Sequence, residues 1–323
     1  MSNDRSGRVD IVVVGSHAPG LRVDVDVLPQ PGETVIGRRM SWPPDGGKGS
    51  NQAIAAARLG ASVAFVGCVG ADDLGDAAVR LMTDSGVDLR HLVRSETAGT
   101  GCGVNIVDAY GLPVMVTIPG ANAELTQQDV AAAFDSYRLP TVVMTQFEID
   151  SSVALHALRL GRAHGARTVL NAAPAVTNLD DGSGEPLPVD VLVVNEGEAS
   201  MLATGSPAAA DVDEFELLAR LQRSTRIPTA IMTVGDRGVF IRDGEDELHI
   251  ARSEVVAVDT SGAGDVFCAA LAVKLAQGAA VRDACAWANL AAGVSVTREG
   301  TIPAFPNFGE IDVASSSNAA PVR

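Results

Sequence analysis

Short apolar runs alternate with amphipathic segments along most of the chain, in the rhythm of a sheet covered by helices. Residues 9–14 and 63–66 are short runs of mostly apolar residues, as in strands that are buried on both faces. Further strands are predicted over 141–147, 168–170, 189–194, 229–234 and 255–258, and helices over 74–85, 152–163, 196–203, 215–223, 265–277 and 281–296. This βαβ order predicts a three-layer α/β/α fold with a doubly wound parallel sheet.

Local signals set several boundaries of these elements. Ser50 is predicted to be the N-cap of a helix over 51–59 that ends at Gly60, and Thr126 is predicted to cap a later helix. Asp243 and Gly244 stand between two short strand-like segments, so they predict the turn of a hairpin.

One zone breaks the rhythm of alternating strands and helices. Residues 22–27 (RVDVDV) alternate strictly between polar and apolar, and 34–40, 103–107 and 114–118 are further strand candidates without intervening helices. We interpret them as a small antiparallel sheet inserted into the α/β body, from about 16–45 and 98–120. Such a sheet is marginal alone, so we expect it to cover a cleft as a lid or to pair with a second copy. The rest predicts one domain over 9–311 with flexible tails at 1–8 and 312–323.

Composition and charge narrow the class of protein. Of the 323 residues, 46% are hydrophobic and 20% are charged, which favours a large folded core over disorder. A net charge of −16 argues against a nucleic acid or an anionic membrane as partner. No apolar run reaches the roughly 18 residues of a membrane span, and no signal-peptide pattern is seen. The four cysteines are scattered, so we expect a cytoplasmic protein without a zinc site.

The strongest chemical signal is the segment 258–265 (VDTSGAGD), between a predicted strand and a predicted helix. Small residues let a ligand approach the backbone, and the free N–H groups at a helix start attract anions, so the segment predicts a phosphate or oxyanion site. Asp265 at the helix entrance is placed to take a proton from a hydroxyl that attacks a phosphate held there. An ordinary turn with an Asp cap is the alternative interpretation.

Two weaker segments add candidate ligand contacts. Residues 45–52 (DGGKGSNQ) lack the Ser or Thr that follows the lysine of a Walker A loop, but Lys48 and Asn51 offer hydrogen bonds to hydroxyls. Residues 195–198 (NEGE) follow a strand at the sheet edge where α/β proteins bind ligands, and they could orient phosphate oxygens and the waters of Mg²⁺. Residues 15–20 (GSHAPG) do not fit the GxGxxG pattern, which argues against a dinucleotide site.

Together these segments resemble the ribokinase branch of the PfkB carbohydrate kinase family, over nearly the whole chain from about 9 to 311. The diagnostic stretches are GGKGSN at 46–51 and DTSGAGD at 259–265. Other matching pieces, in the same order and spacing, are PGET at 31–34, PGAN at 119–122, Glu148, the NxxE motif at 195–198 and TVGDRG at 233–238.

The resemblance implies a ribokinase-like fold with a β lid that often builds a homodimer. It also implies ATP-dependent phosphorylation of a sugar hydroxyl with Mg²⁺, often with K⁺ stimulation. By position, Asp265 is the base, and the anion hole comprises Gly262, Ala263 and Gly264. The implied sugar pocket comprises Gly46, Gly47, Lys48, Asn51, Glu148 and Asp265. The implied nucleotide contacts are Asn195, Thr233, Gly235, Arg237, Gly238, Gly264 and Asn289. Glu198 would organise the Mg²⁺ waters, and K⁺ would be surrounded by Asp259, Ser261, Ser295, Arg298 and Gly300, mostly through backbone oxygens.

Two departures from the family pattern concern the substrate and the cation. Ribokinases usually carry GSxNxD after the first strand, whereas Ala18 and Gly20 stand here in place of the Asn and Asp that grip sugar hydroxyls. Each unpartnered hydroxyl of a bound ribose would cost about 1–3 kcal/mol. We therefore hypothesise a sugar or derivative with a larger or less hydroxylated far end. Ala304 stands where a serine hydroxyl often lies near the cation, which leaves K⁺ activation open.

Three alternative functions stay open at this point. The first is a nucleoside kinase of the same family. The pocket beneath the lid decides between a sugar and a nucleoside as acceptor, and the small Ala18 and Gly20 leave that pocket open. A non-catalytic sugar or nucleotide sensor on the same fold is disfavoured by the intact Asp265 and by the NxxE motif. An NAD-dependent oxidoreductase is the most distant alternative.

Overall fold

The computed structural model describes residues 9–43, 45–110, 113–137, 140–179, 186–207 and 212–318. Its centre is an eight-stranded sheet that is parallel from β4 to β12 and ends in the antiparallel hairpin β13–β14. The strands in spatial order are β14 (Asp246–Ile250), β13 (Val239–Asp243), β12 (Thr229–Thr233), β11 (Val191–Asn195), β10 (Arg167–Asn171), β9 (Val142–Gln146), β1 (Ile11–Val14) and β4 (Val63–Val66). The predicted doubly wound sheet is therefore confirmed, as is the hairpin.

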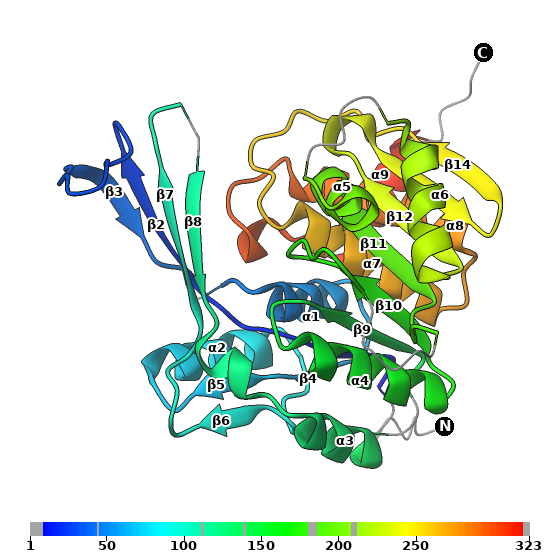
Figure 1. Cartoon of the computed structure of the whole chain (residues 1–323), viewed down its shortest axis with the longest axis horizontal. Coiled ribbons are helices and arrows are strands. Elements are labelled where there is room, and N and C mark those ends of the chain that lie inside the picture. Colours follow the sequence, from blue (N-terminus) through cyan, green and yellow to red (C-terminus); the bar gives the residue numbers. More distant parts are fainter. Residues whose placement is uncertain are drawn as a thin grey trace.

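Helices cover both faces of this sheet, and together they make three layers (Figure 1). A hydrophobic core lies on each face of the sheet, and successive strand residues point to opposite faces. Ile11 and Val13 pack in one core, and Val12 and Val14 pack in the other. The first face is covered by α1 (Lys48–Arg58), α2 (Asp73–Asp84), α7 (Ala263–Ala276), α8 (Val281–Ser295) and α9 (Phe308–Asn318). The second is covered by α3 (Gln127–Ser136), α4 (Ser151–Ala163), α5 (Glu196–Thr204) and α6 (Glu214–Thr225). Short 3₁₀ turns are η1 (Gly120–Glu124), η2 (Gly235–Arg237) and η3 (Ile302–Ala304).

A separate four-stranded sheet stands beside the body, at the left of Figure 1. Its strands in spatial order are β3 (Gly37–Ser41), β2 (Gly20–Val25), β7 (Cys102–Val107) and β8 (Pro113–Ile118). The prediction of an antiparallel sheet is wrong at its centre, because β2 and β7 are parallel. Both strands begin at the body, where the Gly103 N–H donates to the Pro19 carbonyl oxygen at 3.0 Å, so both run outward. A two-stranded parallel sheet of β5 (Cys68–Gly70) and β6 (Val93–Ser95) was not predicted.

Three further predictions need correction. Residues 255–258 form no strand: after β14 the chain turns toward α8, where the Asn289 amide donates to the Ala251 carbonyl oxygen at 2.8 Å. Ser50 lies inside α1 and donates to the Gly46 carbonyl oxygen at 2.8 Å, and Gly47 is the N-cap. Helix α9 continues to Asn318, so the expected tail is helical up to that residue, while 1–8 and 319–323 lie outside the described residues. In the part of the chain that the structure describes, no helix has the length and apolar character needed to cross a membrane.

Candidate active site

The predicted anion hole lies where α7 begins. Gly262 precedes this helix with φ of 74°, a left-handed conformation in which a Cβ would lie 2.7 Å from Thr301 Cγ2. The Ala263 N–H donates to the Thr260 carbonyl oxygen at 3.2 Å. The N–H groups of Gly264 and Asp265 have no acceptor among the described residues, as expected in the first turn of a helix. Such free donors can bind a phosphoryl group.

Asp265 is buried beside these amides, with only 8% of its surface exposed. Its Oδ2 accepts from the Asn51 amide at 2.9 Å, and its Oδ1 accepts from the Gln52 amide at 3.0 Å. Burial raises the pKa of this carboxyl, whereas the charge of Lys48 and the two amide donors lower it. The geometry leaves a desolvated, oriented carboxyl group next to the anion hole, as a general base requires.

The glycine segment before α1 closes tightly on the loop after β1. A Cβ on Gly46 would lie 2.3 Å from the Ala18 carbonyl oxygen, and a Cβ on Gly47 would lie 2.6 Å from the Ala18 nitrogen. Glu148 follows β9 on the other side, and its Oε2 accepts from the Lys48 N–H at 2.8 Å and from the Ser16 hydroxyl at 2.5 Å. The structure therefore brings together all the residues of the implied sugar pocket.

Lys48 projects from the start of α1 into a cavity of about 130 Å³ that Asp265 and Glu198 also line. Burial alone would lower the pKa of Lys48, but the nearby carboxylates of Asp265, Glu148 and Glu198 outweigh it and raise the pKa above its usual value. The ammonium group therefore stays charged. A fixed cation here offsets the negative charge that a phosphoryl group would bring.

The Asn195–Glu198 motif has a structural role as well as a place in this cavity. The Asn195 Oδ1 accepts from the Glu198 N–H at 2.8 Å, and the Glu198 Oε2 accepts from the Asn195 N–H at 2.8 Å, which is a capping box for α5. Burial raises the pKa of Glu198. Its second oxygen has no donor among the described residues and is available to a cation or to water.

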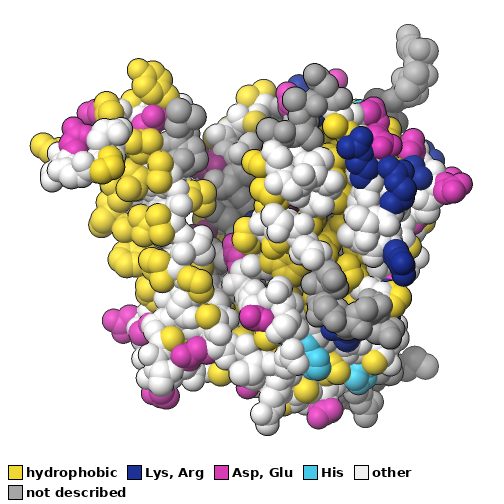
Figure 2. Space-filling view, in the orientation of Figure 1, with side chains coloured by type: hydrophobic (Ala, Val, Ile, Leu, Met, Phe, Trp, Pro, Cys, Tyr) yellow, Lys and Arg dark blue, Asp and Glu magenta, His cyan; other side chains and the backbone are white. Residues whose placement is uncertain are grey.

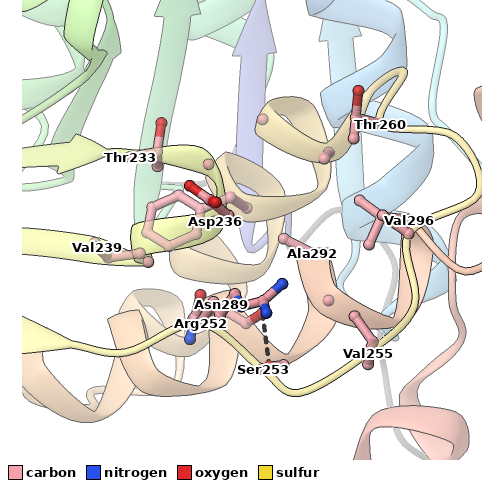
Figure 3. A pocket seen from close by; sticks show the side chains of 17 residues that line it. Thr233, Asp236, Val239, Arg252, Ser253, Val255, Thr260, Asn289, Ala292 and Val296 are labelled. Carbon is pink, nitrogen blue, oxygen red and sulfur yellow. Dashed lines mark hydrogen bonds between the residues drawn. The ribbon is translucent and has the colours of Figure 1, made fainter.

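A larger cavity of about 290 Å³ adjoins the first and shares Thr233 and Gly264 with it. Figure 3 shows Asn289, Arg252 and Ser253 on one side of this cavity and Thr233 across from them. Of the implied nucleotide contacts, Thr233, Gly235, Gly238, Gly264 and Asn289 line the larger cavity, and Asn195 lines the smaller one. Arg237 lines neither, because its guanidinium is paired with Glu196 and Glu214.

A third cavity of about 430 Å³ lies on the other side of Glu148. It is lined by Thr117 of β8, by Phe147 and Ile149 beside Glu148, and by Pro119, Ala123, Asp150 and Pro174. Since Thr117 belongs to the small sheet, this cavity lies between that sheet and the body. The third cavity is linked to the first through Glu148, which lines the third and accepts from the backbone N–H of Lys48, which lines the first.

The residues implied for K⁺ come from two loops that meet. Asp259 joins them, because its Oδ1 accepts from the Ser261 N–H at 2.9 Å and its Oδ2 accepts from the Gly300 N–H at 3.0 Å. The Ser295 hydroxyl donates to the Ala292 carbonyl oxygen at 2.8 Å, and Arg298 pairs with Glu310. The Ser295 hydroxyl and the Arg298 guanidinium are thus engaged by α8 and α9 rather than by the two loops.

Comparison with known proteins decides the family. The sequence profile of the pfkB family carbohydrate kinases matches residues 10–307. The chain belongs to the PfkB family of carbohydrate kinases. It is therefore a phosphotransferase with a hydroxyl group as acceptor, and the resemblance seen in the sequence is confirmed.

Relatives of this PfkB kinase carry two different sugar names. The chain is 31% identical to a deoxyribokinase of Salmonella typhi, over 96% of this chain and 100% of the relative. It is 34% identical to the ribokinase of Bacillus subtilis, over 94% of this chain and 98% of the relative. A solved structure of Arabidopsis thaliana ribokinase with ribose and ATP matches with a TM-score of 0.84 at 26% identity, over 95% of this chain and 98% of that one. The ribokinase-like fold is therefore confirmed.

Sequence reasoning missed several polar residues of this PfkB kinase site. Gln52, Gln146 and Asn171 form buried amide contacts next to Asp265. Polar residues at the ends of the apolar runs at 142–146 and 167–171 were the available signal, since the carboxyl ends of parallel strands face the ligand. His17 stays outside the site: it is fully buried, its ring Nδ1 lies 3.0 Å from the Ser50 hydroxyl, and burial lowers its pKa to about 4.

Proposed function

We propose that the protein transfers the γ-phosphoryl group of ATP to a hydroxyl of a small sugar or sugar derivative other than ribose. The observation that carries this proposal is that the two cavities share Gly264, the residue next to Asp265, which lines the smaller one. The nucleotide would lie in the cavity lined by Asn289 and Thr233, with its phosphates at the start of α7. The acceptor would enter from the Glu148 side, under the small sheet. Asp265 would take the proton of the attacking hydroxyl, and the Gly264 and Asp265 amides would stabilise the transferring group.

The proposal includes a divalent and a monovalent cation, which different residues would bind. The free oxygen of the buried Glu198 carboxylate fits Mg²⁺ through water, since Mg²⁺ usually keeps several waters. Mg²⁺ would supply charge neutralisation for the phosphates. The loops joined by Asp259 fit K⁺ through backbone oxygens, and Ala304 is buried there without a hydroxyl. All four cysteines are free thiols, which supports a reducing, cytoplasmic location.

The geometry around Gly20 supports a non-ribose acceptor. Gly20, Gly103 and Thr117 are neighbours across β2, β7 and β8, so they share the face that meets the third cavity. A Cβ on Gly20 would meet nothing within 4 Å. Packing within the protein therefore does not require glycine at this position, and a side chain there would have open space around it. A substrate with a larger or less hydroxylated far end would use that space.

Wild-type protein is expected to consume ATP with one non-ribose acceptor of a panel of pentoses, hexoses, ketoses, deoxy sugars, polyols and nucleosides, with a poor ribose kcat/KM. The double variant Ala18→Asn, Gly20→Asp adds two hydroxyl partners, so its ribose kcat/KM should rise at least about tenfold, since each bond is worth about 1–3 kcal/mol. Coupled ATP-consumption assays with Mg²⁺, with and without K⁺, measure both values. The wild-type protein assayed in parallel is the reference, and efficient ribose turnover by it would contradict the substrate hypothesis.

A nucleoside acceptor is the second candidate, and the third cavity favours it. Phe147, Ile149, Pro119 and Pro174 give this cavity an apolar lining next to Glu148. An apolar ring attached to the sugar would bury its surface there. A nucleoside as the best acceptor in the panel would select this candidate. Ligand binding without any turnover would instead support a sensor.

We also propose that the protein is a homodimer joined through the small sheet. One face of this sheet carries apolar side chains from Leu21 and Val23 on β2 across to Val114, Val116 and Ile118 on β8, as the strand registers show. Val116 is 53% exposed and Met40 on β3 is 68% exposed. Figure 2 shows hydrophobic side chains gathered over this sheet. An apolar face of this extent indicates an interaction surface, and a second copy presents an identical one.

Val116→Lys is expected to convert a dimer into a monomer of 33.2 kDa, because it places a charge on the apolar face, midway along the edge strand β8. Sedimentation equilibrium at micromolar concentration measures the mass. Val256→Lys is the matched control, since Val256 is 84% exposed on the body and outside the small sheet. A wild-type protein that sediments as a monomer would remove the dimer proposal and leave the kinase proposal intact.

A further inference from the structure

A buried chain of side-chain amides lies behind Asp265. The Gln52 Nε2 donates to Asp265 Oδ1 at 3.0 Å and also to Asn171 Oδ1 at 3.1 Å. The Gln146 Nε2 donates to Gln52 Oε1, and the Asn171 Nδ2 donates to the Val193 carbonyl oxygen at 3.2 Å. Gln52 and Gln146 are fully buried, and Asn171 is 8% exposed. Both polar atoms of the Gln52 amide are therefore used, and both are held by residues outside its own helix.

The fold fixes each member of this chain of amides. Gln146 and Asn171 are register partners at the carboxyl ends of β9 and β10, and Gln52 lies one turn after Lys48 on α1. Gln146 has room only because Gly15 carries no side chain, since a Cβ there would lie 2.2 Å from Gln146 Oε1. Burying an amide costs desolvation free energy unless its polar atoms are hydrogen-bonded, and Gln146 Oε1 has no partner among the described residues, a cost that an apolar side chain would avoid. Three linked side-chain amides next to the Asp265 carboxyl group therefore indicate that they help to position that group.

We propose that Gln52 is a positioning residue that fixes Asp265 Oδ1, with its own amide anchored by Gln146 and Asn171. The proposal rests on the proposed function only in taking Asp265 as the base. With Oδ1 held from behind and Oδ2 held by Asn51, the carboxyl group has one orientation toward the cavity. The Gln52 amide presents its nitrogen to Asp265 because Gln146 donates to its oxygen and Asn171 accepts from the same nitrogen. It thereby favours the ionised form of the base.

Other charged or titratable groups face Asp265 as well, and they set the background of any pH effect. Lys48 on α1 favours the ionised form, whereas Glu148 after β9 and Glu198 on α5 disfavour it. Cys268, one turn later on α7, is a neutral thiol because burial raises its pKa well above the usual value. Since substitution of Gln52 leaves all four in place, its effect can be separated from theirs.

Gln52→Met keeps the side-chain length and removes the amide. We expect the Asp265 carboxyl to titrate about one pH unit higher, because a lost hydrogen bond to the charged form shifts a carboxyl by this order. Carbon-13 NMR of aspartate-labelled protein, with the signal assigned by Asp265→Asn, measures the midpoint without any acceptor. The acidic limb of the kcat profile should move in the same direction, with about a tenfold lower kcat at neutral pH.

Two variants keep the test decisive. Gln146→Met leaves Gln52 in place without its anchor, so it should give a shift in the same direction but smaller, and it replaces Gln52→Met if that variant does not fold. Thr145→Val changes a fully buried neighbour in β9 whose hydroxyl donates to the Gln146 backbone carbonyl oxygen at 3.4 Å, and it leaves the side-chain amides in place, so it should give no shift. An unchanged Asp265 midpoint in folded Gln52→Met or Gln146→Met would overturn the inference. An active Asp265→Asn protein would instead overturn the base assignment.

Discussion

Asp265→Asn is expected to lower kcat by about 10²–10⁴-fold, the contribution typical of a general base. The asparagine keeps the shape of the side chain, its oxygen can accept from Gln52, and its NH2 can donate to the unpartnered Asn51 Oδ1 if the Asn51 amide turns over. What it loses is the ability to take the proton of the acceptor hydroxyl. Steady-state kinetics with the best acceptor measures the loss, and Asp283→Asn, which removes an exposed carboxylate with the same change in charge, should retain full kcat.

The same substitution should not lower stability. Burial raises the pKa of Asp265 above its unfolded value, so the folded protein binds the proton more tightly. The free energy of unfolding therefore falls as pH rises from the unfolded to the folded pKa, and above this range the buried charge costs stability. Since asparagine carries no charge, the Tm of Asp265→Asn at pH 7 should equal or exceed that of the wild type. Near-normal turnover by this variant would remove Asp265 as the base.

Gly264→Ala is expected to lower kcat/KM by about 10²-fold or more while the protein stays folded. Gly264 lines both the cavity of about 290 Å³ and the cavity of about 130 Å³. A Cβ on Gly264 would meet nothing within 4 Å in the protein itself. The added methyl group would therefore occupy space that a phosphoryl group needs, and misplacement of reacting groups by about 1 Å costs this much. The free energy of unfolding should stay equal or rise by up to about 1 kcal/mol, because alanine favours a helix over glycine.

Gly262→Ala is the matched control for this prediction. Gly262 has φ of 74°, and a Cβ would lie 2.7 Å from Thr301 Cγ2 and 2.9 Å from the Phe305 ring. We therefore expect this variant to lose stability as well as activity, in contrast to Gly264→Ala. Thermal unfolding and kinetics of the two variants, side by side, separate a blocked ligand from a strained backbone. Full activity of Gly264→Ala would contradict the placement of the phosphoryl group at the start of α7.

The sequence predicted the parallel part of the large sheet well because strands such as β1, β4 and β9 are buried on both faces and are short apolar runs. The small sheet was predicted from strict alternation, as in residues 22–27, but not the parallel pairing of β2 and β7. Strand direction depends on where the connecting segments return, and Pro19 and Gly103 lie far apart in the sequence. The apolar run at 255–258 failed as a strand because Val256 and Val258 are exposed on a connecting segment rather than buried in a sheet.

The candidate site was predicted where the motifs are local. Residues 46–51 and 259–265 each combine glycines with a helix start, which is a chemical signal within one short segment. Gln146 and Asn171 gave only the weaker signal of a polar residue that ends an apolar run, and their role depends on the strand register that makes them neighbours. Gln52 directly follows the glycine segment, but its contact with Asp265 depends on the packing of α1 against α7. Arg237 lies in a matching motif, yet its two ion pairs with α5 and α6 residues draw it away from the cavity.

The most direct test of the proposed function is phosphorus-31 NMR of wild-type protein with ATP, Mg²⁺ and the best acceptor of the panel. We predict that ADP and a phosphate monoester of the acceptor appear together, without inorganic phosphate, because the acceptor rather than water attacks the γ-phosphoryl group. The Asp265→Asn protein should give neither product on the same timescale. Inorganic phosphate in place of the ester, or no loss of ATP with any acceptor, would contradict the account.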